Sequence, residues 1–274
     1  MTGVEAEPVD RLQENVSPEY FFHHYYVQRK PVILSKVARS WPARKKWSLE
    51  AMRSMVCEHS DVDTVECVAH SKTDPTHYSN VTLPSMGRYF DYLEQCVAHK
   101  KPQEAALKNG VTVPRSVVEA ACPVPKVLKT LHNDRKLALR DMLGREKARL
   151  FISAGGFHGR CHYDRFGYAF FSVQVKGAKT WYLYKASSLP LRRLAAFDNA
   201  PLEDFTRPEV HNGHSGWVAK LQEGDMLFLP PLTYHSVCHT GGYNVNIDFA
   251  CLPDVHWVPA IREPLGLQDV AGAL

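Results

Sequence analysis

The chain lacks any apolar run close to the roughly 20 residues that a membrane-spanning helix needs. It also lacks a C-x-x-C motif, an internal repeat and a low-complexity segment. The N-terminus is polar and has no apolar signal core. Seven cysteines are scattered and odd in number, which is typical of reduced thiols. We therefore expect a protein of the cytoplasm or nucleus with no membrane partner.

A strong excess of charge of one sign is missing as well. The formal net charge is +4, from 33 Lys and Arg against 29 Asp and Glu. Basic residues are locally rich at 44–46 and 126–149, but such a mild excess usually reflects solvated helix faces rather than nucleic-acid binding. The content of 45% hydrophobic and 11% aromatic residues is enough for a sizeable core, which excludes a wholly disordered chain.

The first half of the chain is expected to be rich in helices. Ser17 and Ser48 predict two helix starts, the first strengthened by the proline that follows Ser17. We expect helices at 17–30, 48–58 and 85–100, strands at 31–34, 62–70 and 77–83, an irregular segment at 102–126, and helical stretches up to about residue 145.

The second half changes character. Short β-rich or aromatic runs are separated by Gly, Pro and Asp, at 148–154, 169–175, 180–184, 216–222, 226–231 and 243–249. Many short strands separated by such turn-forming residues predict a barrel or jelly roll. The fold class is thus mainly β with N-terminal helices: a helix-rich region at 1–145 wrapping a jelly-roll core at 146–252, with a tail at 253–274.

Three His-x-Asp pairs occur, whereas chance would supply roughly one. Residues i and i+2 share a face on a strand, but on a helix they point about 200° apart. Only one pair lies in a strand-like setting, and only there do both side chains readily converge on a metal. The pairs are His59 and Asp61, His132 and Asp134, and His162 and Asp164; the last is the strand-like one.

A third ligand is needed, because non-haem iron(II) oxygenases hold the metal with two His and one carboxylate. His235 is the best candidate, since it follows a predicted turn at Gly224-Asp225, a strand and two prolines. A His at that point lies at the beginning of a strand, at the end of the jelly roll where binding sites usually open. His239 is the competitor.

Several segments form a recognisable set of motifs. They are His-Tyr-Asp at 162–164, QVKGAK at 174–179, GDMLFLPP at 224–231 followed by Tyr234-His235, GGYNVNIDF at 241–249, and KPVIL with SWPARKKWSLEAM at 30–52. Together they resemble the JmjC, or cupin-like, 2-oxoglutarate oxygenases. Over residues 17–249 the chain most resembles the small hydroxylases of that family, typified by factor inhibiting HIF.

The resemblance implies a double-stranded β-helix, Fe(II) held by His162, Asp164 and His235, and 2-oxoglutarate chelating the iron. It implies that Lys179 pairs with the distal carboxylate of 2-oxoglutarate. A buried ammonium is costly unless an anion neutralises it, which agrees with that role. Lys176 and Lys185 are alternatives to Lys179. The implied reaction is hydroxylation of a C–H bond, with succinate and carbon dioxide as coproducts.

The chain departs from the family pattern near the cosubstrate. Members often carry Thr or Ser three residues before the first His ligand, bonding 2-oxoglutarate, and Gly159 stands there instead. Thr180 and Tyr182 are candidates for the missing hydroxyl. The interval from the carboxylate ligand to Lys179 is two residues longer than in the asparaginyl hydroxylases. Further along, Asp248 stands where Asn is common, and it shares a predicted strand face, favoured as pocket lining, with Asn244 and Asn246.

Four functions are compatible with these features. The leading hypothesis is hydroxylation of a protein side chain by a monomeric Fe(II)/2-oxoglutarate oxygenase. A tRNA-base hydroxylase is the second, and the basic balance permits RNA as a partner. A histone lysine demethylase is the third, less favoured because no reader module is present. A non-catalytic cupin-like binding protein is the fourth, and Gly159 is the feature that keeps it open.

Overall fold

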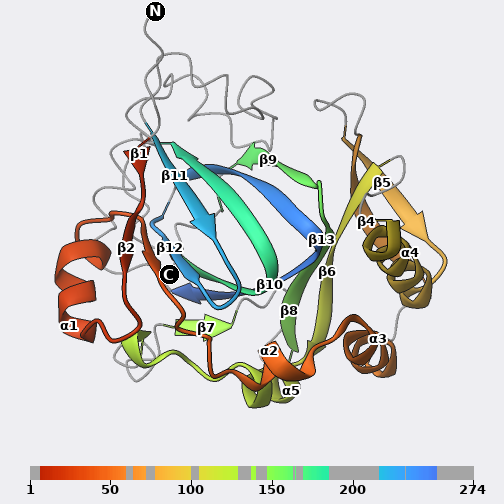
Figure 1. Ribbon diagram of the computed structural model, residues 1–274, viewed down its shortest axis with the longest axis horizontal. Helices are drawn as coiled ribbons and strands as arrows, with labels where there is room; N and C mark the ends of the chain where they lie inside the picture. Colours follow the sequence, from red (N-terminus) through yellow and green to blue (C-terminus); the bar gives the residue numbers. More distant parts are fainter. Residues whose placement is uncertain are drawn as a thin grey trace, which may run out of the picture.

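Two long antiparallel strands are central to the fold, β10 (Ala169–Tyr184) and β13 (Tyr234–Cys251). The computed structural model describes residues 7–59, 64–71, 78–99, 105–128, 137–139, 147–162, 164, 169–184, 216–231 and 233–251. Within these residues the strands join into one 13-stranded sheet, which curls around a common interior (Figure 1). The predicted class, mainly β with N-terminal helices around a jelly-roll core, is confirmed.

The order along the sheet is β2-β3-β12-β10-β13-β8-β6-β4-β5, with β1 and β11 joined beside β10, and β7 and β9 beside β13. Residues before 147 therefore supply strands at both ends of the sheet. The bounds are β1 (Glu7–Pro8), β2 (Asp10–Leu12), β3 (Val32–Leu34), β4 (Val65–Ser71), β5 (Tyr78–Leu83), β6 (Ala105–Pro114), β7 (Leu137–Leu139), β8 (Lys147–Ala154), β9 (His158–His162), β11 (Gly216–Leu221) and β12 (Met226–Leu229).

Helices cover the outside of the curled sheet (Figure 1). Both predicted helix starts are confirmed: Ser17 Oγ accepts from the Tyr20 N–H at 3.1 Å, and Ser48 Oγ from the Ala51 N–H at 3.1 Å. The bounds are α1 (Pro18–Phe21), which continues as a π turn η1 (Phe22–Tyr26), α2 (Pro42–Lys46), α3 (Leu49–Glu58), α4 (Met86–His99), α5 (Arg115–Ala121) and a 3-10 turn η2 (Lys126–Leu128).

Two expectations for the first half are wrong. The segment expected to be irregular contains β6 and α5, because its prolines flank the regular elements instead of interrupting them: Pro114 ends β6 and caps α5. Residues 137–139, expected to be helical, form β7 beside β13, so strand pairing overrides their helical periodicity.

The sheet has a different apolar cluster on each side. The larger cluster joins the outer face to the helices, and it includes Phe21, Trp41 and Leu93. The smaller one lies inside the curl, and it includes Trp181 and Leu183 of β10. Because the inner cluster covers only part of the interior, the remaining inner face is left to polar side chains.

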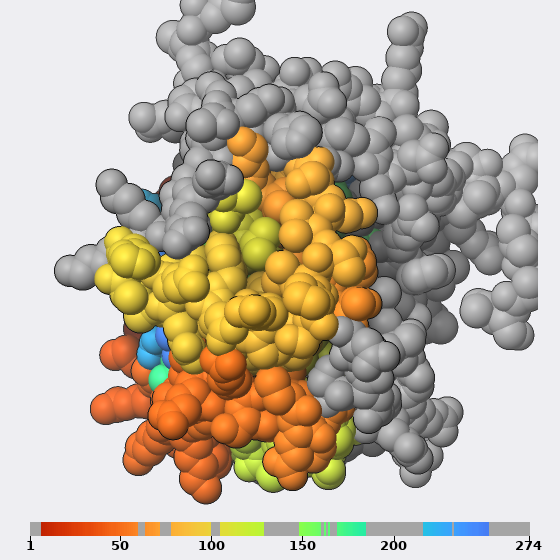
Figure 2. Space-filling model, turned by 90° about the vertical axis from the view of Figure 1, so that its right-hand side faces the viewer, coloured from red at the N-terminus to blue at the C-terminus, as the bar shows by residue number. Residues whose placement is uncertain are grey.

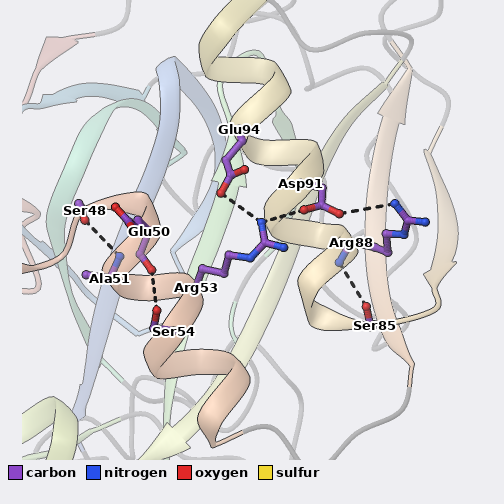
Figure 3. A network of polar contacts seen from close by, with 9 residues as sticks. All are labelled: Ser48, Glu50, Ala51, Arg53, Ser54, Ser85, Arg88, Asp91 and Glu94. Atoms are coloured by element: carbon purple, nitrogen blue, oxygen red, sulfur yellow. Dashed lines mark hydrogen bonds and ion pairs between the residues drawn. The ribbon is translucent and has the colours of Figure 1, made fainter.

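α3 and α4 are joined at the surface by Arg53, whose guanidinium bonds Asp91 at 2.7 Å and Glu94 at 3.2 Å (Figure 3). Figure 2 shows this face, with α4 above α3. All three side chains are at least a third exposed, so this ion-pair network contributes little to stability.

The turn before β12 depends on a buried carboxylate. Asp225 Oδ2 accepts from Arg11 at 2.7 Å and from the Gln222 N–H at 3.1 Å, while Oδ1 accepts from the Lys36 N–H at 3.1 Å. These bonds tie β2 and the residues after β3 to the turn.

We expect Asp225→Ala to lower the free energy of unfolding by about 2 kcal/mol, because it leaves two part-buried backbone N–H groups and the Arg11 guanidinium without their acceptor. Urea denaturation measures this loss. Asp91→Ala removes an exposed carboxylate that also pairs with Arg53, and it should cost less than about 1 kcal/mol. Equal losses in the two variants would contradict the structural role of Asp225.

Candidate metal and cosubstrate site

The predicted site lies on the inner face of β9, β10 and β13. The sequence indicated separate strands at 169–175 and 180–184, but they form one strand with register shifts between Gln174 and Lys176 and between Lys176 and Ala178. Gly177 lies within the second of these shifts and has a φ of +76°. The irregularity reverses the alternation, so that Gln174 faces inward before it and Lys179 faces inward after it.

Gly177→Ala should destabilise the protein by more than about 1 kcal/mol, since φ is positive and an added Cβ would lie 2.5 Å from the Tyr243 carbonyl oxygen. Gly87→Ala in α4 is the matched control, because its Cβ would meet only ordinary contacts at 3.5 Å and beyond. That variant should be neutral or slightly stabilising. Thermal unfolding followed by circular dichroism compares them, and equal midpoints would contradict the requirement for glycine at the bulge.

The structure brings His162, Asp164 and His235 together. His162 on β9 is the register partner of His235 on β13, and their ring centroids are 4.4 Å apart. Asp164 Oδ2 lies 4.0 Å from His235 Nε2. His235 Nδ1 lies 2.9 Å from the Thr233 carbonyl oxygen, so Nδ1 carries the proton and donates a hydrogen bond to that oxygen. The lone pair of Nε2 therefore faces the carboxylate.

Two imidazoles and one carboxylate are the donor set that suits non-haem Fe(II). The hydrogen bond from His235 to a backbone carbonyl is the kind of support that fixes a metal-binding His in orientation and tautomer. Within the described part of the chain, no three such side chains already stand at coordinating separations. The fit to iron thus rests on the donor types, on the strand pairing and on the direction of Nε2.

The competing histidines lie elsewhere. His239 is buried four residues further along β13, where Nδ1 contacts Ser153 Oγ and the ring packs 5.3 Å from Phe157. His59 is the C-terminal cap residue of α3. The remaining members of the other two pairs, Asp61, His132 and Asp134, lie outside the described residues.

Lys179 is buried inside the curl, with 4% of its surface exposed. Its Nζ donates to Asn246 Oδ1, and Asn246 Nδ2 donates to Asp248 Oδ1 at 3.0 Å. Burial lowers the pKa of Lys179 well below its usual value, the positive charge of Lys108 lowers it further, and Asp248 partly opposes both effects. An anionic ligand beside Nζ would remove this penalty.

The two predicted hydroxyl donors on β10 do not agree with the structure. Thr180 and Tyr182 alternate with Lys179 and Trp181, so their side chains point to the opposite face of the strand. Lys176 also points away, with Nζ bonded to the Arg44 carbonyl oxygen at 2.7 Å. Lys185, the other alternative, lies outside the described residues.

Sequence reasoning missed two groups near the site. Trp181 lies 5.3 Å from His235, and its indole N–H is buried without a hydrogen-bond partner in the described part of the chain. Lys108 on β6 acts electrostatically on Lys179. The alternation of apolar with polar or small residues over 107–113 was the available signal, but that segment was expected to be irregular.

Among the described residues, no helix is both long enough and apolar enough to cross a bilayer. The cysteines whose side chains are described are free thiols.

Comparison with known proteins agrees with the fold. Residues 18–249 match the family described as "Cupin-like domain". The human protein named tRNA wybutosine-synthesizing protein 5 is 27% identical over 262 residues, covering 90% of this chain and 79% of that protein. The Gallus gallus protein of the same name is 23% identical over 273 residues, covering 94% of this chain and 80% of that protein. Both relatives are named for tRNA modification rather than for hydroxylation of a protein side chain.

Proposed function

The chain belongs to the cupin-like domain family, and from this membership we propose that it is an Fe(II)- and 2-oxoglutarate-dependent oxygenase that hydroxylates a base in tRNA. One observation carries the enzymatic part: His162 and His235 are strand partners beside Asp164, on the inner face that also holds the buried Lys179. The similarity to two proteins named for tRNA modification supports the substrate class.

In this proposal His162, Asp164 and His235 hold the iron, and Lys179 binds the distal carboxylate of 2-oxoglutarate. Bound iron would supply oxygen activation, which couples decarboxylation of 2-oxoglutarate to hydroxylation of a C–H bond. The protein orients the ligands: the Thr233 carbonyl oxygen accepts a hydrogen bond from the Nδ1–H of His235 and thereby keeps Nε2 unprotonated.

The inner apolar cluster keeps bulk water away from this chemistry. Trp181 and Leu183 of β10 are buried beside His235, and Val237 of β13 packs against the same cluster. A dry interior strengthens the attraction between the Lys179 ammonium and a carboxylate, because the local dielectric constant is low.

The substrate class can be tested with an extract from cells. Purified protein with Fe(II), ascorbate and 2-oxoglutarate should release succinate when the extract has been treated with protease, and not when it has been treated with RNase. Mass spectrometry of digested tRNA should then show a nucleoside heavier by one oxygen. Activity that survives RNase and disappears with protease would instead assign a protein side chain. Absence of succinate with every extract would overturn the oxygenase proposal.

A further inference from the structure

Lys108 lies on β6, three strands along the sheet from β10, and its charge acts on Lys179, the residue proposed to bind the cosubstrate. Lys108 is the register partner of Ser153 on β8. Ser153 Oγ is hydrogen-bonded to His239 Nδ1, and His239 is the register partner of Lys179. The two lysines therefore flank one buried histidine.

Two aromatic rings hold the Lys108 side chain over the inner face. Its Nζ lies 5.0 Å from the ring centroid of Phe151 and 5.9 Å from that of Phe157. Phe157 is buried and its ring lies 5.3 Å from His239. Attraction between a cation and the face of an aromatic ring favours this position, so the ammonium stays close to His239.

The charges at this end of the site favour a carboxylate. Burial and the charges of Lys179 and Lys108 lower the pKa of His239 well below its usual value, which favours the neutral imidazole. The negative charge of Asp248 raises the pKa of Lys179 and so partly opposes these effects there, and Asp248 accepts a hydrogen bond from Asn246. An anion placed between the two ammonium groups would offset their mutual repulsion.

Gly159 explains why a second cation would be useful. The family resemblance of the sequence implies a hydroxyl at this position that bonds 2-oxoglutarate, and Gly159 has none. It is the register partner of Val237, and an added Cβ would meet only Val237 atoms at 3.7 Å and beyond. Space therefore does not demand glycine at this position.

We propose that Lys108 replaces that hydroxyl and, with Lys179, binds the distal carboxylate of the cosubstrate, one ammonium to each oxygen. The proposal rests on the proposed function, because it assigns a ligand to the same site. It makes Lys108 a residue that determines affinity for 2-oxo acids with a second carboxylate, while 2-oxo acids without one gain nothing from it.

The test is calorimetric titration of 2-oxoglutarate into the 274-residue chain loaded with Mn(II), which measures binding without turnover. Lys108→Met should raise the dissociation constant by about tenfold to a hundredfold, the range expected for a hydrogen bond between charged groups. Lys108→Arg should stay close to wild type. Lys220→Met, which removes an exposed lysine on β11, should change nothing.

A double variant and a second ligand extend this binding test. Gly159→Ser in the Lys108→Met background should recover part of the affinity, because it restores the missing hydroxyl. Pyruvate, which has no second carboxylate, should bind equally to wild type and Lys108→Met. If Lys108→Met binds 2-oxoglutarate as wild type does while Lys179→Met does not, the role of Lys108 is overturned and the proposed function stands. If the folded wild-type protein binds no 2-oxoglutarate at all, both fall.

Discussion

Asp164→Ala should abolish succinate formation and lower the iron content of the purified protein. Loss of groups that merely orient metal ligands typically costs 10- to 100-fold in affinity or activity, so loss of a ligand itself should cost more than about 100-fold. The carboxylate also faces the Nε2 atom of His235, and without it two neutral imidazoles alone would hold the metal.

The matched control is Asp61→Ala, because Asp61 belongs to a His-x-Asp pair that follows helix α3 rather than a strand. It should retain both iron and turnover. Iron is measured by elemental analysis and turnover by succinate release. An Asp164→Ala variant with full iron and full turnover would remove this carboxylate from the metal site.

The metal ligands could be predicted because local pattern determines them. A His and an Asp two apart on a strand share a face, and the Gly-Asp turn, the apolar strand and two prolines marked where His235 would lie. The structure adds the pairing of His162 with His235, which joins residues 73 positions apart and which no local pattern contains.

The side-chain directions on β10 could not be predicted in the same way. Simple alternation would leave Lys179 on the face opposite Gln174, whereas the irregularity at Gly177 brings both inside. Once the reversal is known, Thr180 and Tyr182 must point outward. The role of Gly177 depends on contacts with Tyr243 and Asn244 on β13, which are distant in sequence.

Lys108 was missed for a related reason. Its segment is flanked by prolines and was expected to be irregular, although buried and partly buried residues alternate along most of β6. Only the pairing of β6 with β8 places Lys108 beside Ser153 and thus near the cosubstrate end. Residues whose position depends on strand order are the ones that local sequence patterns leave out.

Lys179→Met should have two opposite effects, and together they distinguish a binding residue from a structural one. Without ligand, the variant should be more stable than wild type by about 1 kcal/mol or more, since a buried ammonium that bonds a neutral amide is replaced by an apolar chain of similar length. Thermal unfolding of the metal-loaded protein without 2-oxoglutarate measures this gain.

With 2-oxoglutarate the order should reverse. Ligand at 100 times its dissociation constant stabilises a protein by about 2.7 kcal/mol, and Lys179→Met should lose nearly all of this because the ammonium that attracts the distal carboxylate is gone. Lys176→Met is the control, since Lys176 lies on the same strand but bonds the Arg44 carbonyl oxygen on the outer side. That variant should keep the full ligand-induced shift. A Lys179→Met protein that is less stable without ligand, yet still shifts with 2-oxoglutarate, would show that Lys179 serves the fold and that another group binds the carboxylate.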